Sequence, residues 1–192
     1  YYDRASDLAG LVMSGGTLGA VPSSVGIFGG KLALTADRGA LAQAEEMAAK
    51  GAGREQIWNE TGWFQGKDGK WRFEIDDFPS QVHPGNIGSL PQKLEHKELY
   101  EAYPSLSKVE LGYGELSGRG KYGKPQWPGD KEEIGLSEVD KMFKQKSILM
   151  HELQHAVQRR ENFEPGANYE KVGPTAYWSS PGEVEARNVQ RR

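Results

Sequence analysis

The chain lacks cysteine altogether, and this absence removes several kinds of chemistry at once. None of its 192 residues is Cys, which excludes disulfide frameworks, thiolate zinc sites and cysteine nucleophiles. An excess of positive charge is also missing, because 24 Lys and Arg stand against 27 Asp and Glu, a net charge of −3. The balance therefore gives no strong sign of nucleic-acid binding through bulk positive charge.

Apolar residues are scarce as well. They make up 36% of the chain, whereas glycine contributes 25 residues, so we expect a loop-rich domain with a modest core rather than a coiled coil or a membrane bundle. The uncharged run at residues 8–30 is long enough to span a bilayer. It contains seven glycines and Pro22, which favour a flexible lead-in over a membrane span.

The composition changes near residue 32, and this change sets the expected domain organisation. Residues 1–31 are predicted to form a glycine-rich lead-in, and residues 32–192 a single domain. Within that domain, residues 32–80 form an N-terminal subregion with a helix and a tryptophan-rich hairpin. Because the sequence starts with Tyr rather than Met, we expect it to be part of a longer multi-domain chain.

Local signals place the first elements. Thr35 or Asp37 can cap a helix that Gly51 stops, and a short helical turn follows at residues 55–59. Residues 71–75 alternate apolar and charged side chains, and a turn with an Asp-Gly pair separates them from the aromatic run at residues 63–65. This pattern predicts a β-hairpin.

The middle of the chain gives weaker signals. Residues 97–102 read as a short helix, and residues 109–113 and 134–136 read as strands. The long polar stretch at 114–130, rich in glycine and proline, is predicted to be a loop.

The last third is predicted to be helical. Ser137 and Asp140 fit a capping box that opens a helix running to about Arg160, and a final helix is expected from Pro181, a favoured first-turn position for proline, through Arg192.

The first of these helices carries the pattern with the clearest chemistry, His151-Glu152-Leu153-Gln154-His155. Residues four apart lie on one face of a helix, about 5–6 Å apart at Cβ, so both imidazoles can bind one tetrahedral Zn²⁺. Glu152 can reach a water on the open metal position and take its proton. The alternatives are a solvated histidine pair and a metal site without activity.

A catalytic zinc needs a third protein ligand. The remaining histidines, His83 and His96, lie far upstream in loop-like segments. The metzincin pattern fails because Gln158 and Glu161 stand where it requires Gly and His, and peptide deformylases use a cysteine that this chain lacks. A carboxylate from the final helix is therefore the expected ligand.

Two carboxylates of that helix compete for the role. Glu183 and Glu185 follow the second histidine by 28 and 30 residues, and they are about 200° apart on a helix, so only one can face the metal. We favour Glu183 and keep Glu185 as the alternative; either could instead be a solvated carboxylate at a helix start.

Two histidines and a glutamate on one helix, followed by a glutamate on a later helix, resemble the gluzincin branch of zinc metallopeptidases, the thermolysin-like group. The resemblance implies an α+β, zincin-like fold with a small β-sheet, an HExxH helix and a following glutamate-bearing helix. In that group an acidic or amide residue near the glutamate ligand often orients a histidine. Here Arg187 stands four residues after Glu183 and Val189 four after Glu185, which departs from the pattern, and Asn188 is a possible substitute.

A wider resemblance covers roughly residues 32–192. Residues 55–64, 68–77 and 182–190, together with the HExxH helix, resemble domains of the large polyvalent proteins of phages and other mobile elements. This resemblance implies a zincin-like domain inside a much longer protein that is delivered with phage or plasmid DNA, hence in the virion or the cytoplasm of a bacterial host. It implies no particular substrate.

Catalysis would also need a partner for the developing oxyanion, and Tyr177 is the expected candidate, with a packed aromatic as the alternative. A peptide substrate would lie along a sheet edge, for which we choose the strand at residues 109–113. The sequence thus predicts a zinc metallopeptidase that hydrolyses peptide bonds in a protein or peptide, with Glu152 as general base. The alternatives are a non-enzymatic module, zinc-stapled or metal-free, and a domain that processes its own polyprotein.

Overall fold

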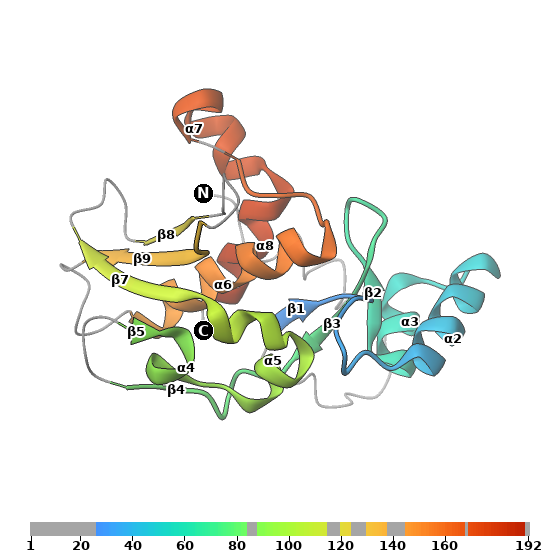
Figure 1. The fold of residues 1–192 in the computed structure, drawn as a ribbon. Helices are drawn as coiled ribbons and strands as arrows, with labels where there is room; N and C mark the ends of the chain where they lie inside the picture. Colours follow the sequence, from blue (N-terminus) through green and yellow to red (C-terminus); the bar gives the residue numbers. More distant parts are fainter. Residues whose placement is uncertain are drawn as a thin grey trace.

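The structure, a computed structural model, describes residues 26–83, 88–114, 120–123, 130–137, 145–167 and 169–190. It has a mixed α+β architecture with small sheets (Figure 1). Within these residues, no helix combines the length and the apolar character that crossing a bilayer requires. In chain order, the elements are β1 Ile27–Gly29, α2 Arg38–Ala49, α3 Arg54–Thr61, β2 Trp63–Gln65, β3 Trp71–Ile75, β4 Gln81–Val82, β5 Gly88–Ser89, α4 Leu90–Lys93, β6 Leu94–Glu95, α5 Lys97–Ala102, η2 Pro104–Lys108, β7 Glu110–Gly114, β8 Gly120–Gly123, β9 Glu133–Ser137, α6 Gln145–Glu161, α7 Tyr169–Ser179 and α8 Pro181–Gln190.

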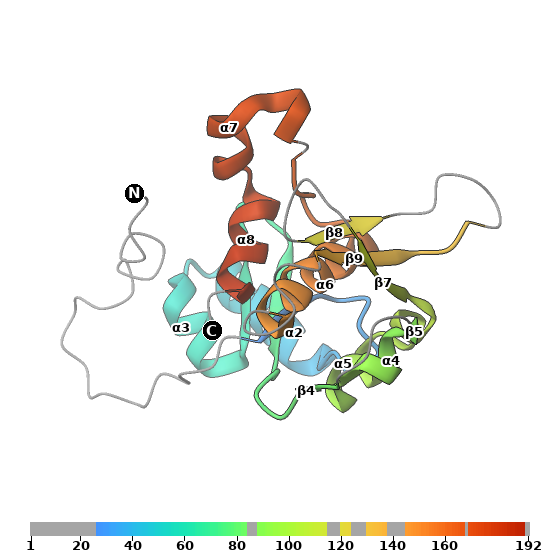
Figure 2. The ribbon, with the colours of Figure 1, turned by 90° about the vertical axis from the view of Figure 1, so that its left-hand side faces the viewer.

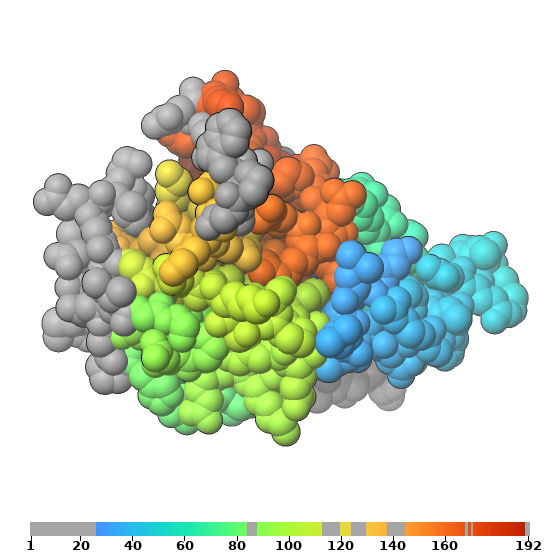
Figure 3. All heavy atoms as spheres, viewed as in Figure 1, coloured from blue at the N-terminus to red at the C-terminus, as the bar shows by residue number. Residues whose placement is uncertain are grey.

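The N-terminal elements form a lobe at one side of the molecule, where α2 and α3 project from the body (Figure 3). Asp37 caps α2 by accepting a hydrogen bond from the backbone N–H of Ala40, as the sequence predicts. The antiparallel hairpin of β2 and β3 is also confirmed. Its turn places Gly69 at a φ of 73°, a conformation that glycine adopts without strain. These elements enclose a small core, which we call the tryptophan cluster: Leu41, Ala44, Ile57, Trp63 and Trp71.

Strand β1 completes the three-stranded sheet of this lobe. It pairs antiparallel with β3, giving the order β1-β3-β2, and its three residues are buried. This strand lies within residues 1–31, the stretch expected to be a flexible lead-in. It is ordered there because its buried pairing with β3 outweighs the effect of the glycines that flank it. Residues 1–25 lie outside the described residues.

A four-stranded sheet forms the other half of the fold, with the order β5-β7-β9-β8. Strands β7 and β9 are parallel, and the other two pairings are antiparallel. The predicted strand at 109–113 is therefore present as β7, but the prediction that it forms an edge is wrong, because β5 and β9 flank it. The edge strands of this sheet, within the described residues, are β5 and β8. Strand β8 lies in the stretch predicted to be a loop.

Helix α6 packs between this sheet and β1, and α8 packs along α6 (Figures 1 and 2). Ser137 ends β9 and pairs with Gly114 rather than opening α6, whose described part begins at Gln145; the rest of the predicted capping box lies outside the described residues. The stretch before α8 forms the helix α7, which projects away from the body (Figure 2). The main core combines residues of β1, the sheet, α6 and α8, including Ile27, Leu111, Ile134, Leu149 and Val189.

Candidate metal centre

Two helices bring two imidazoles and a carboxylate close together. His151 and His155 lie one turn apart on α6, and Glu183 lies in the first turn of α8. The loop between α6 and α7 runs close beside them, because a Cβ built on Gly166 would lie 2.4 Å from Glu183 Oε1 and 2.6 Å from His155 Cε1. A glycine is thus needed where this backbone passes the two side chains.

The distances between the three groups fit a shared ion. The two Nε2 atoms are 3.1 Å apart, and the Glu183 carboxylate lies 3.6 Å from His151 Nε2 and 3.4 Å from His155 Nε2. An ion with bonds of about 2.05 Å holds its tetrahedral ligands about 3.3 Å from one another. The carboxylate–histidine distances are longer than a good hydrogen bond, yet close to that tetrahedral edge. Among the described residues, these three form the group of His and acidic side chains able to hold a metal ion.

Gln158 fixes the orientation of His155. The Gln158 side chain, only 1% exposed, donates through Nε2 to the carbonyl of Gly182 at 2.9 Å and to Glu185 Oε1 at 3.2 Å. Its Oε1 therefore accepts the hydrogen on His155 Nδ1, 2.8 Å away. This assignment leaves the lone pair of His155 Nε2 facing the centre, as metal binding requires.

Buried atoms at the centre lack ordinary partners. Neither Glu183 Oε2 nor His151 Nδ1 has a hydrogen-bond partner among the described residues, although the side chains of Glu183, His151 and His155 are only 5%, 11% and 14% exposed. Burial alone would raise the pKa of Glu183, but His151, His155 and Tyr177 outweigh it and lower that pKa. Burial lowers the pKa of His155. A carboxylate and two imidazoles are a donor set that binds Zn²⁺.

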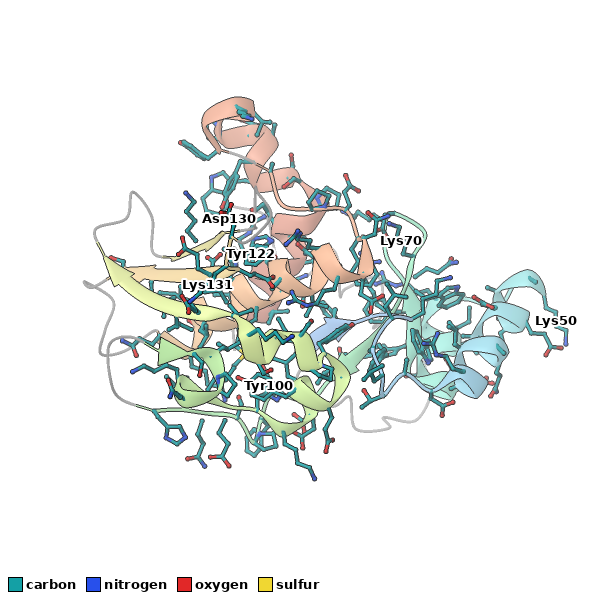
Figure 4. The ribbon with its side chains drawn as sticks, viewed as in Figure 1. Lys50, Lys70, Tyr100, Tyr122, Asp130 and Lys131 are labelled. Carbon is teal, nitrogen blue, oxygen red and sulfur yellow. The ribbon has the colours of Figure 1, made fainter. Side chains whose placement is uncertain are left out.

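Glu152 lies on the same helix, directly beside this group, and is buried under the edge strand β8. A Cβ built on Gly120 would lie 2.7 Å from Glu152 Oε1, and the backbone N–H of Tyr122 donates to the carboxylate. Burial raises the pKa of Glu152 to about 7, the nearby Glu183 adds to the rise, and His151 opposes it. Figure 4 shows Tyr122 on the sheet beside α6.

Tyr177, the expected oxyanion partner, extends from α7 toward Glu183. Burial raises its pKa, and both the charge of Glu183 and a hydrogen bond to it add to this shift. Its ring packs edge-on against Tyr169 and Trp178. The hydroxyl thus lies close to the carboxylate of the centre, while the ring is also a packed aromatic.

Glu185 is held elsewhere. Its Oε2 accepts from Arg72 Nε at 2.6 Å, and its Oε1 accepts from Gln154 at 2.8 Å. The structure thus brings Glu183, not Glu185, to the histidines. No local pattern in the sequence indicates the ion pair with Arg72, because its partners are 113 residues apart.

The other residues weighed as ligands lie away from the centre. His83 is near the exposed Glu95, and the buried His96 caps α5 by accepting from the backbone of Leu99. Asn188 is exposed, so the amide beside His155 is Gln158 rather than Asn188. The spacing of Gln158, three residues after His155, was the signal available for finding it.

Comparison with protein families places part of the chain. Residues 26–83 match the family model described as large polyvalent protein associated domain 23. The match covers the N-terminal lobe, including Arg72, and ends before α6. It supports the context of a large polyvalent protein and says nothing of peptide-bond hydrolysis. No curated protein and no solved structure matches the chain.

Proposed function

We propose that this chain contains a zincin-like metallopeptidase domain that hydrolyses peptide bonds. His151, His155 and Glu183 would hold Zn²⁺, and Glu152 would act as general base. The observation that carries the proposal is the convergence of these three groups at 3.1–3.6 Å with a buried carboxylate beside them on the same helix.

Zinc bound there would polarise the scissile carbonyl and lower the pKa of a water in its remaining coordination position. Glu152 would accept a proton from the attacking water and pass it to the leaving amine. Its burial under β8 and its hydrogen bond from Tyr122 would hold the carboxylate in one place during both transfers. The Tyr177 hydroxyl would donate a hydrogen bond to the developing oxyanion.

The edge strand β8 is the expected contact for a substrate backbone. It pairs with β9 on one side and, within the described residues, with no strand on the other. An extended peptide can add to such an edge through main-chain hydrogen bonds. This strand passes directly over Glu152, so a peptide bound there would lie next to the proposed base.

A non-enzymatic zinc-stapled module is the second candidate, and the low exposure of the three metal-binding side chains favours it. A structural zinc site uses four protein ligands, whereas a catalytic site keeps one position for water. The group within the described residues has three, which favours the hydrolase. The third candidate is a self-processing domain, whose substrate would be the polyprotein that contains it.

The test combines zinc analysis with a peptide-library assay of the wild type and Glu152→Gln. We expect one zinc per chain in both proteins and a loss of about 10²–10⁴-fold in turnover for the variant, because a general base contributes that much. Glu95→Gln, at a carboxylate whose side chain is 68% exposed, is the matched control and should retain full turnover.

Equal turnover in wild type and Glu152→Gln, or a wild type without zinc, would reject the hydrolase. Zinc that raises the melting temperature without any turnover would identify the stapled module. Cleavage confined to a longer polyprotein, and abolished by Glu152→Gln, would identify self-processing.

A further inference from the structure

One face of α6 is turned toward the lobe of residues 26–83. Gln154, Gln158 and Glu161 recur along the helix at spacings of four and three residues, and all three are buried. Gln154 accepts from the backbone N–H of Phe28 at 2.9 Å and donates to its carbonyl at 3.2 Å. Glu161 accepts from the N–H of Leu32 at 2.9 and 3.0 Å. The helix that carries both histidines is thus bonded directly to this lobe.

Arg72 of β3 links the lobe to α8 through an ion pair. Its guanidinium donates to Glu185 on one side and to both carboxylate oxygens of Asp68, at 2.8 and 3.1 Å, on the other. It also lies 3.9 Å above the ring of Phe163. The Arg72 side chain is 4% exposed, and that of Glu185 is 13% exposed, so solvent competes little with this ion pair.

The link continues from Glu185 to the metal centre. Glu185 Oε1 accepts from the Nε2 of both Gln154 and Gln158. Because the Nε2 of Gln158 is directed at Glu185 and Gly182, its oxygen must face His155 Nδ1. An amide turned the other way would present a donor to Nδ1 and favour the histidine form with hydrogen on Nε2, which cannot bind a metal through Nε2.

We propose that Arg72 is a positioning residue for the metal centre: it holds Glu185, which together with the Gly182 carbonyl orients the amide of Gln158 and thereby directs the lone pair of His155 Nε2 at the ion. The inference rests on the proposed zinc site. The lobe that matches the polyvalent-protein family model would then take part in the site, although it lies far from α6 in the sequence. Removal of Arg72 would leave the Glu185 carboxylate buried without its charged partner. Only the amides of Gln154 and Gln158 would then hold it, so its position relative to Gln158 would be less fixed.

The test measures zinc affinity by chelator competition and the His155 tautomer by ¹⁵N NMR of the metal-free protein. Arg72→Met should weaken zinc binding about 10–100-fold, as loss of a residue that orients a ligand does, and should shift metal-free His155 toward the form with hydrogen on Nε2. The matched control is Arg160→Met, which breaks the bidentate pair between Arg160 of α6 and Glu132, the residue before β9. It should keep zinc affinity within about twofold of wild type.

A folded Arg72→Met protein with wild-type zinc affinity and an unchanged His155 tautomer would overturn the proposal. Should this variant fail to fold, Arg72→Lys keeps the charge without the bidentate fork; intermediate zinc affinity supports the proposal, and wild-type affinity overturns it. A wild type that binds no zinc would reject the proposed function, whereas the tautomer shift in Arg72→Met would still decide the role of Arg72.

Discussion

The tryptophan cluster of the N-terminal lobe and the candidate metal centre on α6 and α8 are both largely shielded from solvent, but they contain different groups. The cluster consists of apolar side chains, among which Trp63 stacks at a tilt on Phe73 with ring centroids 4.9 Å apart. The candidate metal centre contains the buried carboxylates of Glu183 and Glu152 and two histidines whose side chains are 11% and 14% exposed. Apolar burial stabilises the fold at about 25 cal/mol per Å², whereas a buried carboxylate costs free energy unless a partner compensates it.

This difference in buried groups indicates that the lobe contributes to folding stability, whereas the proposed function depends on the candidate metal centre. Apolar contacts in the lobe stabilise the fold without requiring a precise orientation of the side chains. The lobe can therefore serve as a rigid support for the candidate metal centre. A change in the lobe's core should therefore alter stability and leave metal binding intact, and a change at the centre should do the reverse. Arg72 and Asp68 stand between the two regions.

The largest effect should come from the core of the lobe. Leu41→Ala removes a buried side chain of α2 and should lower the free energy of unfolding by about 2–5 kcal/mol, because it leaves a cavity. Urea unfolding followed by circular dichroism measures this loss. Zinc affinity of the folded fraction should stay within about twofold of wild type, and a tenfold loss would show that the two regions are not separable.

The next effect concerns pH and Asp68. Burial opposes its ionisation, but Arg72 and the backbone N–H groups of Glu164 and Lys70 prevail and lower its pKa from 3.8 to about 2. A lowered folded-state pKa stabilises the fold above the unfolded pKa, and this contribution, about 2 kcal/mol, is lost as pH falls from about 4 to about 2.

Acid titration of stability in wild type and Asp68→Asn checks this expectation. The variant should be less stable at neutral pH and should lose less on acidification, so the two curves converge near pH 2. Glu46→Gln, at an exposed carboxylate, is the control and should follow the wild-type curve. Parallel curves for wild type and Asp68→Asn would contradict the assignment.

A smaller free-energy change is expected at the centre itself. Gly166→Ala places a methyl group 2.4 Å from Glu183 Oε1 and 2.6 Å from His155 Cε1, so these side chains and the loop must shift relative to one another. Zinc affinity should fall about tenfold, or about 1.4 kcal/mol, with little change in the melting temperature of the metal-free protein.

Gly53→Ala is the matched control for that substitution. Its backbone φ is −69°, and within the described part of the chain no atom lies within 4 Å of the added Cβ. It should leave zinc affinity unchanged. Equal zinc affinity in Gly166→Ala and wild type would show that this close approach of the loop does not hold Glu183 and His155 at the ion.

The smallest effect should come from the outer surface of the lobe. Lys50 lies at the far tip of α2 (Figure 4), and its ion pair with Glu46 joins side chains that are 72% and 65% exposed. Lys50→Gln should change the free energy of unfolding by less than about 0.5 kcal/mol and leave zinc affinity unchanged, as urea unfolding and chelator competition can show. A larger effect would mean that the lobe's surface contributes to its stability.

Elements with local signals could be predicted from the sequence. The Asp37 cap, the Asp-Gly turn of the hairpin and Pro181 at the start of α8 each act through neighbours in the chain. The register of the two histidines is local too, since it depends on helix geometry alone. Glu183 required a choice between two carboxylates, and that choice depended on how α8 packs along α6.

Features set by distant contacts could not be predicted. β8 is short and glycine-rich, so its propensity indicated a loop, whereas pairing with β9 and packing over Glu152 make it a strand. Gln158 was weighed as a failed match to one family pattern, although its role depends on Gly182 and Glu185 across the helix pair. Arg72 has no local signal for its partner, because an ion pair between β3 and α8 exists only after both have packed.

The paired hydrogen bonds between Gln154 and the backbone of Phe28 bear on how such a domain could be rearranged between proteins. Gln154 occupies one of the two positions that the HExxH pattern leaves open, yet its amide is matched to a strand more than a hundred residues earlier. A recombination event that carried α6 and α8 into a new protein without that strand would leave the Gln154 amide oxygen buried without its hydrogen-bond partner, in the middle of the motif. The helix and the lobe would therefore have to be inherited together, or exchanged together with compensating substitutions at Gln154.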